Sequence, residues 1–358
     1  MLKNQEYLDF IRYSVEGQDD VPESFNRIDW EKFFKFCYNH SILGVVFSGL
    51  ERANKRIPQS LLFEWIGAVE NLKAQNKTVN KRILSITKWF NEKKHRCVIL
   101  KGQANALMYP NPQLRSPGDI DIWVEGETTD LIKLVLSECP NAHYSIHHVK
   151  MPVFNDVSVE VHYRPVYLSN WFKDNLLQRY IREKEEQQFS HKERFCDAAI
   201  GTVTDEFNIV FQMLHMYNHF FSSRNNFKQF IDYYYLLNKD LPEDKRKECA
   251  DVLENIGVKK YASGIMWIMK ELLGVENERL ILEPNEKIGR LILNESYNTG
   301  TYSTENNLKY VIEQFVANFR IVHQFPKEVL INPLFLVWHQ WWKLKMKMAL
   351  RKEVLHER

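Results

Sequence analysis

Two aspartates separated by one residue, Asp119 and Asp121, are the part of this 358-residue sequence best suited to chemistry. They begin the run Asp-Ile-Asp-Ile-Trp-Val, in which isoleucines alternate with the acidic residues. Side chains of a strand alternate between its faces, so both carboxylates face one way while Ile120, Ile122 and Val124 face a core. Neighbouring carboxylates repel each other and are costly to bury. A divalent cation removes that conflict, which predicts a Mg²⁺ or Mn²⁺ site.

A third carboxylate is available on a later alternating segment, Val157 to His162. There Val159 and Val161 take one face, and Glu160 takes the other together with His162. If this strand pairs beside the first, Glu160 joins the two aspartates in one cluster. Three carboxylates can hold two metal ions that bridge a triphosphate, activate an attacking oxygen and stabilise a leaving pyrophosphate.

Cationic residues near the aspartates can supply positive charge for phosphate groups. Lys101 ends the apolar run Cys-Val-Ile-Leu and precedes Gly102, which places its ammonium at the edge of the predicted sheet. Arg115 lies in a proline-stiffened loop four residues before Asp119. Arginine suits bidentate phosphate contact and lysine acts as a point charge. We expect both to bind phosphate, with Ser116 as a further donor.

The elements that must position these residues follow from the hydrophobic pattern. Residues 1–95 are predicted to be a helical region, residues 96–165 an α/β core, and residues 166–358 a second helical region. We therefore predict an α+β fold, with a small mixed sheet between N-terminal and C-terminal helices. The core is expected to contain a strand at 97–100, a short helix at 104–108, the acidic strand, a helix over 131–136, and a hairpin of 144–154 with 157–163 that turns at Asn155-Asp156.

Composition and charge exclude several classes of protein. The formal net charge is only +2, so bulk charge does not favour nucleic acid as a partner. The five cysteines are scattered without a Cys-x-x-Cys motif, which fits a reducing cytosol. We find neither a signal peptide nor an apolar run approaching the ~18 residues of a membrane span. These features predict a cytoplasmic protein without integral membrane contact.

Two further patterns allow more than one interpretation. His215 and His219 have a spacing that can bind zinc, but no third ligand is evident. The segment 334–343 is rich in aromatic residues and leads into several lysines. Such a segment can lie at a membrane interface, which leaves a peripheral membrane contact of this helix open. We favour a terminal helix that packs on the body of the protein, with its cationic end stabilised by the helix dipole.

The order of these parts resembles the nucleotidyltransferase superfamily that contains DNA polymerase β and the antibiotic nucleotidyltransferases. That superfamily has a glycine-containing turn after its first strand, an acidic-x-acidic strand, and a third acidic strand. The corresponding parts here are Lys101-Gly102, Asp119-Ile120-Asp121 and Glu160. The resemblance implies that Asp119, Asp121 and Glu160 bind the metal and perform the catalysis.

The chain more closely resembles the bacterial nucleotidyltransferase family called NTP-transferase type 5, over roughly residues 75–275. The matching elements, in order, are Lys101-Gly102, Tyr109-Pro110, Arg115, Asp119-Ile120-Asp121, Glu160-Val161-His162, His219 and Asp232. This resemblance implies a metal-dependent enzyme that moves a nucleoside monophosphate from a nucleoside triphosphate, such as ATP, to an acceptor hydroxyl and releases pyrophosphate. It also implies that the acceptor side is lined by His162, His219, Lys228, Gln229 and Asp232.

Two alternatives remain open at this point. The usual turn of the superfamily is Gly-Ser or Gly-Gly, whereas Gly102 is followed by Gln103, which leaves room for a non-catalytic relative that binds a nucleotide. Metal-dependent glycosyltransferases also use Asp-x-Asp, but they normally place a larger nucleotide-binding unit before it. For the acceptor, a small molecule or sugar is favoured over RNA, because no basic stripe with interleaved aromatic residues lies near the site.

Overall fold

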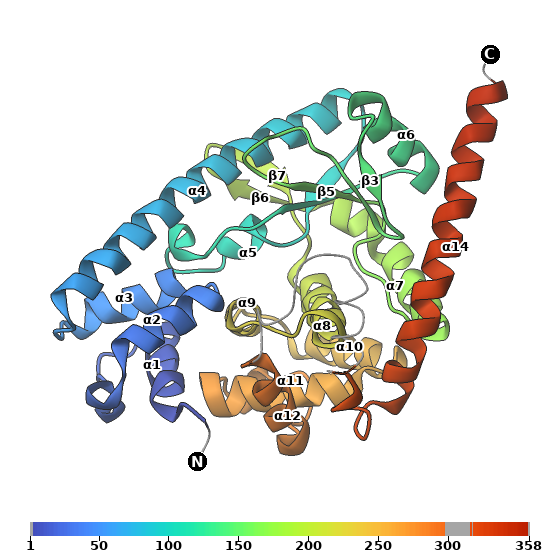
Figure 1. Cartoon of the computed structure of the whole chain (residues 1–358). Coiled ribbons are helices and arrows are strands. Elements are labelled where there is room, and N and C mark those ends of the chain that lie inside the picture. Colours follow the sequence, from blue (N-terminus) through green and yellow to red (C-terminus); the bar gives the residue numbers. More distant parts are fainter. Residues whose placement is uncertain (1–2, 298–315, 317, 357–358) are drawn as a thin grey trace. The chain divides into compact units, whose positions relative to one another are not determined.

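The computed structural model of the protein describes residues 3–297, 316 and 318–356, with side chains described up to residue 350. The chain divides into two compact units, each assembled from three segments. The first unit comprises Met1–Thr78, Asn105–Pro117 and His215–Tyr310, and the second comprises Val79–Ala104, Gly118–Leu214 and Val311–Arg358. Figure 1 labels the elements along the chain.

The described residues of the first unit form helices joined by loops, without a β-strand. Its core is rich in aromatic side chains, among them Phe10, Phe33, Trp65 and Tyr261, all completely buried. Its elements are α1 (Gln5–Glu16), η1 (Glu23–Arg27), α2 (Trp30–Asn39), α3 (Leu43–Ala53), the first part of α4 (Gln59–Glu92), η2 (Pro112–Leu114), the end of α8 (Asp205–Ser222), α9 (Phe227–Leu237), α10 (Glu243–Asn255), α11 (Lys259–Leu273), η3 (Asn277–Arg279) and α12 (Glu286–Ser296).

The second unit is built around a five-stranded mixed sheet with strand order β1-β2-β5-β4-β3. Only β2 and β5 run parallel, and the other neighbouring strands are antiparallel. This sheet with its accompanying helices confirms the predicted α+β class. The elements are β1 (Cys97–Ile99), α5 (Gln103–Ala106, shared with the first unit), β2 (Ile120–Val124), α6 (Thr128–Glu138), β3 (His143–Tyr144), β4 (His148–Lys150), β5 (Val159–His162) and α7 (Trp171–Ser190).

The alternation of side chains on β2 and β5 behaves as the sequence predicts. Ile120, Ile122 and Val124 are at most 1% exposed and form part of the core. On the opposite face, Asp121 of β2 lies in register with Glu160 of β5, and the two strands are parallel. Farther along that face the indole of Trp123 packs on Phe189, with ring centroids 4.7 Å apart. The polar face of the sheet is therefore covered by aromatic residues at one end and carries the carboxylates at the other.

The prediction of an all-helical region after residue 165 is wrong at one place. Residues 192–201 form an antiparallel hairpin of β6 (Lys192–Phe195) and β7 (Ala198–Gly201). A Cβ at Gly201 would lie 2.3 Å from the carbonyl oxygen of Cys97, so only glycine lets β7 approach β1 this closely. The hydrophobic pattern does not indicate this hairpin, because its first strand is largely charged and solvent-facing. Contact with β1, which is distant in the sequence, supplies its stability.

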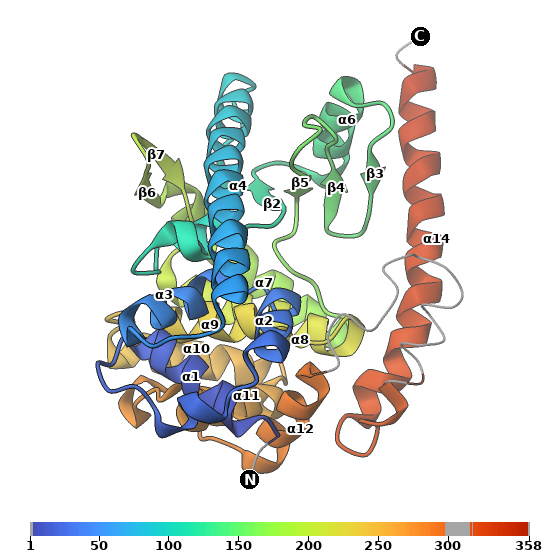
Figure 2. The same ribbon diagram turned by 60° about the vertical axis from the view of Figure 1, so that its left-hand side comes forward.

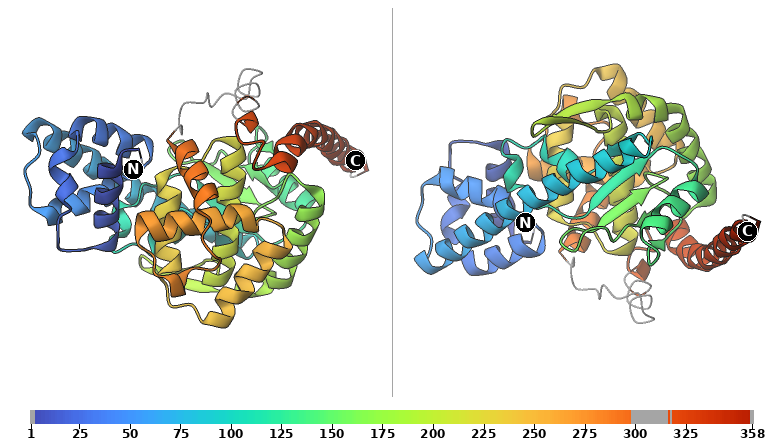
Figure 3. Two further views of the ribbon diagram at one scale, coloured as in Figure 1. Left: turned by 90° about the horizontal axis from the view of Figure 1, so that it is seen from below. Right: turned by 90° about the horizontal axis from the view of Figure 1, so that it is seen from above.

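The long C-terminal helix α14 (Pro326–His356) belongs to the second unit. Figure 2 shows it as a single extended rod, and Figure 3 shows it nearly end-on. Its inner face packs on the same unit, since Phe335 stacks on Tyr167 and Trp342 meets Tyr144. Its outer face leaves Leu334 and Val337 more than two thirds exposed. Among the helices within the described ranges, none has the length and apolar character that crossing a bilayer requires.

A buried histidine in the first unit predicts how stability depends on pH. His40 is 3% exposed and packs between the rings of Phe36 and Phe227, with centroid distances of 4.3 and 4.9 Å. Burial lowers the pKa of His40 from 6.5 to about 4. The unfolded chain therefore binds this proton first as pH falls, so the folded state loses stability between pH 6.5 and 4. We expect a loss of about 2–3 kcal/mol from this residue.

The measurement is urea unfolding at neutral and at mildly acidic pH. His40→Leu should lose less stability on acidification than the wild type, by about 2–3 kcal/mol, whatever its stability at neutral pH. His143→Leu, which changes an exposed histidine of β3, is the matched control and should follow the wild type. An identical pH dependence for His40→Leu and the wild type would contradict the assignment.

Candidate active site

The centre of the candidate site is a pair of carboxylates on neighbouring strands. Asp121 and Glu160 lie in register on β2 and β5, and their side chains are 2% and 15% exposed. Carboxylate oxygens of both residues and a ring nitrogen of His162 all lie within 4.8 Å of one another. These three residues could together hold a metal ion. His162, expected on the acceptor side, contacts Asp121 directly, with Nε2 3.0 Å from Oδ1.

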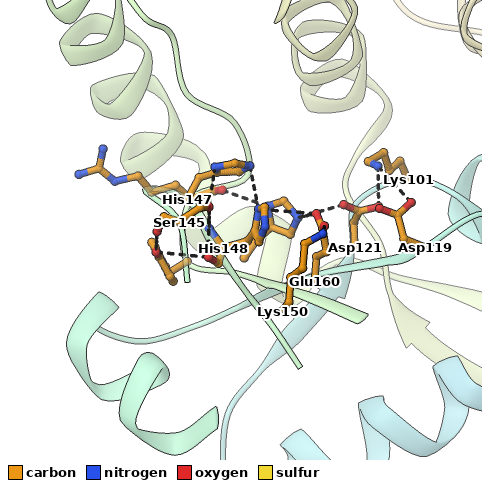
Figure 4. A network of polar contacts seen from close by, with 11 residues as sticks. Lys101, Asp119, Asp121, Ser145, His147, His148, Lys150 and Glu160 are labelled. Atoms are coloured by element: carbon orange, nitrogen blue, oxygen red, sulfur yellow. Dashed lines mark hydrogen bonds and ion pairs between the residues drawn. The ribbon is translucent and has the colours of Figure 1, made fainter. Parts of the chain in front are cut away.

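Asp119 is joined to this pair through Lys101. The Lys101 ammonium lies 2.6 Å from Oδ2 of Asp121 and 3.7 Å from Oδ1 of Asp119, which is more exposed than Asp121. Figure 4 shows Lys101 with the two aspartates at one end of a polar network, the labelled histidines at the other, and Glu160 between them. The ammonium thus lies where the sequence predicts positive charge, and it neutralises the aspartates directly.

The two in-register carboxyl groups of the site differ in acidity. Burial favours the neutral form of Asp121, but Lys101 and His162 hold the pKa of this group well below its usual range. Burial and the nearby charge of Asp121 raise the pKa of Glu160. Burial opposes the charge of Lys101, yet the carboxylates around it raise the pKa of its ammonium above the ordinary value. Asp121 is therefore held as an anion, and Glu160 is the more basic carboxylate.

Two further residues reach Glu160 from β4. The ammonium of Lys150 lies 3.4 Å from Oε1 of Glu160, and Nδ1 of His148 lies 3.6 Å from Oε2. Both follow from the antiparallel register, which places Lys150 opposite Glu160 and His148 opposite His162. Sequence reasoning missed Lys150, although the alternation His-x-Lys opposite Glu-x-His would reveal it once the register is known.

The Lys101-Gly102 turn after β1 requires its glycine. Gly102 has φ of +65°, in the left-handed region that side chains with a Cβ disfavour. The next residue, Gln103, is 3% exposed and donates its amide to Oδ1 of Asn80 at 2.6 Å. This glutamine, which replaces the usual serine or glycine of the superfamily, is therefore part of the packing in the second unit.

Arg115, expected to bind phosphate, forms a buried ion pair in the first unit. Its Nε and Nη2 each lie 2.7 Å from a carboxylate oxygen of Asp232, and both residues are 4% exposed. Tyr109 and Asn105 also donate to Asp232, at 2.6 and 3.2 Å. Burial raises the pKa of Asp232, but the pairing with Arg115 outweighs it and holds the pKa below its ordinary value. The guanidinium is thus engaged in a structural network, and the phosphate role of Arg115 stays a prediction.

The other residues predicted at the substrate also lie in the first unit. Ser116 accepts a hydrogen bond from Arg115 through its backbone oxygen, at 3.3 Å. His219 places Nδ1 2.8 Å from the hydroxyl of Ser223. The backbone N–H of Lys228 donates to the carbonyl of His40. The acceptor role of His219, Lys228 and Asp232 stays a prediction.

A small mixed sheet with carboxylates side by side on two of its strands is the arrangement expected of a nucleotidyltransferase. The chain belongs to the family described as uncharacterised nucleotidyltransferases, which matches residues 26–274. This confirms the family resemblance drawn from the motifs.

Comparisons with individual proteins add one similar structure. The chain is similar to the crystal structure of an antigenic nucleotidyltransferase-like protein from Paracoccidioides brasiliensis. The two are 12% identical with a TM-score of 0.35, and the match covers 60% of this chain and 95% of that one. No curated protein matches this chain.

Proposed function

We propose that this protein is a metal-dependent nucleotidyltransferase that moves a nucleoside monophosphate from a nucleoside triphosphate to an acceptor hydroxyl and releases pyrophosphate. The observation that carries the proposal is the in-register pair of Asp121 and Glu160, in a chain of a nucleotidyltransferase family. ATP is one candidate nucleotide. A small molecule or a sugar is the candidate acceptor.

The residues present fit a divalent cation. Asp119, Asp121 and Glu160 supply carboxylate oxygens, the ligands that Mg²⁺ and Mn²⁺ prefer. Carboxylates in register repel each other, and the ammonium groups of Lys101 and Lys150 offset that repulsion. When bound, divalent ions would polarise the triphosphate and stabilise the charge of the leaving pyrophosphate.

The protein's own side chains have distinct roles in the proposed reaction. The acceptor oxygen attacks the α-phosphorus, and the bond from that phosphorus to the oxygen that bridges it to the β-phosphorus breaks. Glu160, the more basic carboxylate, takes the proton of the acceptor hydroxyl. Asp121 remains anionic and would attract cations to the site. Lys101 lies between the two aspartates and can stabilise the departing pyrophosphate.

The test is release of pyrophosphate from each nucleoside triphosphate, with Mg²⁺ or Mn²⁺ and a fractionated pool of small metabolites as acceptors. We expect release that depends on the added fraction and falls to background when a chelator removes the metal, because the carboxylates then hold no cation. Transfer of an α-phosphate label to a metabolite would identify the acceptor. Parallel reactions with RNA should give no label transfer.

Two outcomes would favour the alternatives. Nucleotide that raises the melting temperature by mass action, with no pyrophosphate released with any acceptor, would indicate a binding module. A melting-temperature increase with nucleotide sugars but not with triphosphates would indicate a glycosyltransferase.

A further inference from the structure

Three histidines form a second cluster beside the carboxylates. One ring nitrogen each from His147, His148 and His162 lies within 4.8 Å of the others. The ring of His147 lies 4.3 Å from that of His148 and 5.4 Å from that of His162, measured between centroids. The side chains of His148 and His162 are 12% and 6% exposed. Imidazoles gathered this closely, and this far from solvent, form a potential ligand set for a metal ion.

The backbone brings all three rings to one side of the sheet. Consecutive residues of a strand face opposite ways, but the chain bends before β4, so His147 and His148 both turn toward His162. The carbonyl of His147 accepts the N–H groups of Tyr163 and Arg164 at 3.1 and 3.2 Å, which fixes this bend against the end of β5. The arrangement is therefore held by the backbone.

Two of the three histidines also have a partner on the ring nitrogen that would orient a ligand. Nδ1 of His147 lies 3.2 Å from the hydroxyl of Ser145, and Nδ1 of His162 lies 3.3 Å from the carbonyl oxygen of Arg164. Metal-binding histidines commonly use one nitrogen for such a contact and the other for the ion. His147 directs its remaining nitrogen, Nε2, to within 2.9 Å of Nδ1 of His148.

Hydrogen-bond counting also indicates a cation at His162. Both of its ring nitrogens face oxygen acceptors, the Asp121 carboxylate and the Arg164 carbonyl. A neutral imidazole carries one proton and can donate to only one of them. A metal ion at His162 would satisfy the nitrogen that carries no proton.

We propose that His147, His148 and His162 form a transition-metal site that adjoins the carboxylate pair and shares His162 with it. Imidazole ligands favour ions such as Zn²⁺ and Co²⁺ over Mg²⁺, which prefers oxygen ligands and retains its water. Three histidine ligands leave a coordination position open, as in catalytic zinc sites. Glu160, with Oε2 3.6 Å from Nδ1 of His148, is a candidate for that position.

The test uses Co²⁺ alone as the probe, on full-length protein freed of metal by a chelator. Tetrahedral nitrogen coordination gives Co²⁺ a visible absorption band, so this readout does not depend on nucleotidyl transfer. We expect the band to saturate at one equivalent, to be removed by Zn²⁺, and to persist in excess Mg²⁺. His147→Leu and His148→Leu should each weaken Co²⁺ binding by more than about 100-fold, beyond the loss typical for a partner that only orients a ligand.

Two controls separate this site from the carboxylates and from general effects. His143→Leu, at an exposed histidine of the adjoining strand β3, should bind Co²⁺ like the wild type. Asp121→Asn should keep the band, because all three histidines remain. Equal affinity in the wild type, His147→Leu and His148→Leu would overturn the proposal, as would the absence of a band in the wild type.

X-ray absorption of the zinc-loaded wild type keeps the proposal testable if the variants fail to fold. Three imidazole nitrogens around zinc are expected, and a shell of oxygen ligands alone would overturn the site. Pyrophosphate release is assayed separately with Mg²⁺, so failure of the histidine site is distinguishable from failure of the proposed transferase.

Discussion

Asp121→Asn is expected to lower the rate of pyrophosphate release by about 10³-fold, or about 4 kcal/mol of transition-state stabilisation. The substitution keeps the size of the side chain and removes the charge that the site is built to hold. Asp121 is 2% exposed and held as an anion by Lys101 and His162. A neutral amide at this position cannot balance a divalent cation, and Asp119 and Glu160 cannot replace it because they occupy the two flanking positions.

The measurement is kcat/KM for pyrophosphate release, with circular dichroism as the check on folding. Lys101 keeps Asp119 as a partner and its side chain is 20% exposed, so we expect the variant to fold. Asp130→Asn is the matched control, because the Asp130 side chain is 67% exposed on α6 and has no part in the site. Normal turnover in purified Asp121→Asn would refute the assignment of the carboxylates.

Strand identity and facing could be predicted because they depend on local pattern. The alternation in 120–124 and 159–162 selects the buried faces, and a shift by one residue would move valines and isoleucines into contact with the polar groups. This alternation predicts that Asp121 and Glu160 lie on the same face of the sheet if their strands are neighbours. The register of the two strands, which the alternation does not predict, makes them directly adjacent on that face.

Two parts of the site could not be predicted because they depend on contacts between distant residues or on a local bend. Alternation along a strand would turn only one of His147 and His148 toward the carboxylates, whereas the bend before β4 turns both that way. Arg115 and Asp232 are 117 positions apart, and no periodicity connects them. The sequence alone suggests a ligand as the partner of a loop arginine such as Arg115, although a carboxylate far away in the sequence can pair with it equally well.

Asp232→Leu is expected to destabilise the protein by about 3–5 kcal/mol, because it leaves the guanidinium of Arg115 buried without a counter-charge. Both side chains of the pair are nearly inaccessible, at 4% and 6% exposed. Arg115→Met should lower the stability by a similar amount, because it leaves the carboxylate of Asp232 buried without a counter-charge. A phosphate-binding arginine at an open site would instead tolerate the loss of its carboxylate partner.

The double variant Arg115→Met/Asp232→Leu decides between these roles. With both charges removed, we expect it to be more stable than either single variant, although Tyr109 and Asn105 lose an acceptor at about 1–3 kcal/mol each. Urea unfolding of the wild type, the two single variants and the double variant gives the coupling energy, which should exceed about 2 kcal/mol.

Arg82→Met is the matched control, because Arg82 pairs with Asp156 at 2.8 Å and its side chain is 38% exposed. This substitution should cost at most about 1 kcal/mol of stability. Additive losses would show that Arg115 and Asp232 act independently. A double variant that folds but has a greatly raised KM for nucleotide would indicate that Arg115 binds phosphate. We expect an unchanged KM, because the ion pair stabilises the fold.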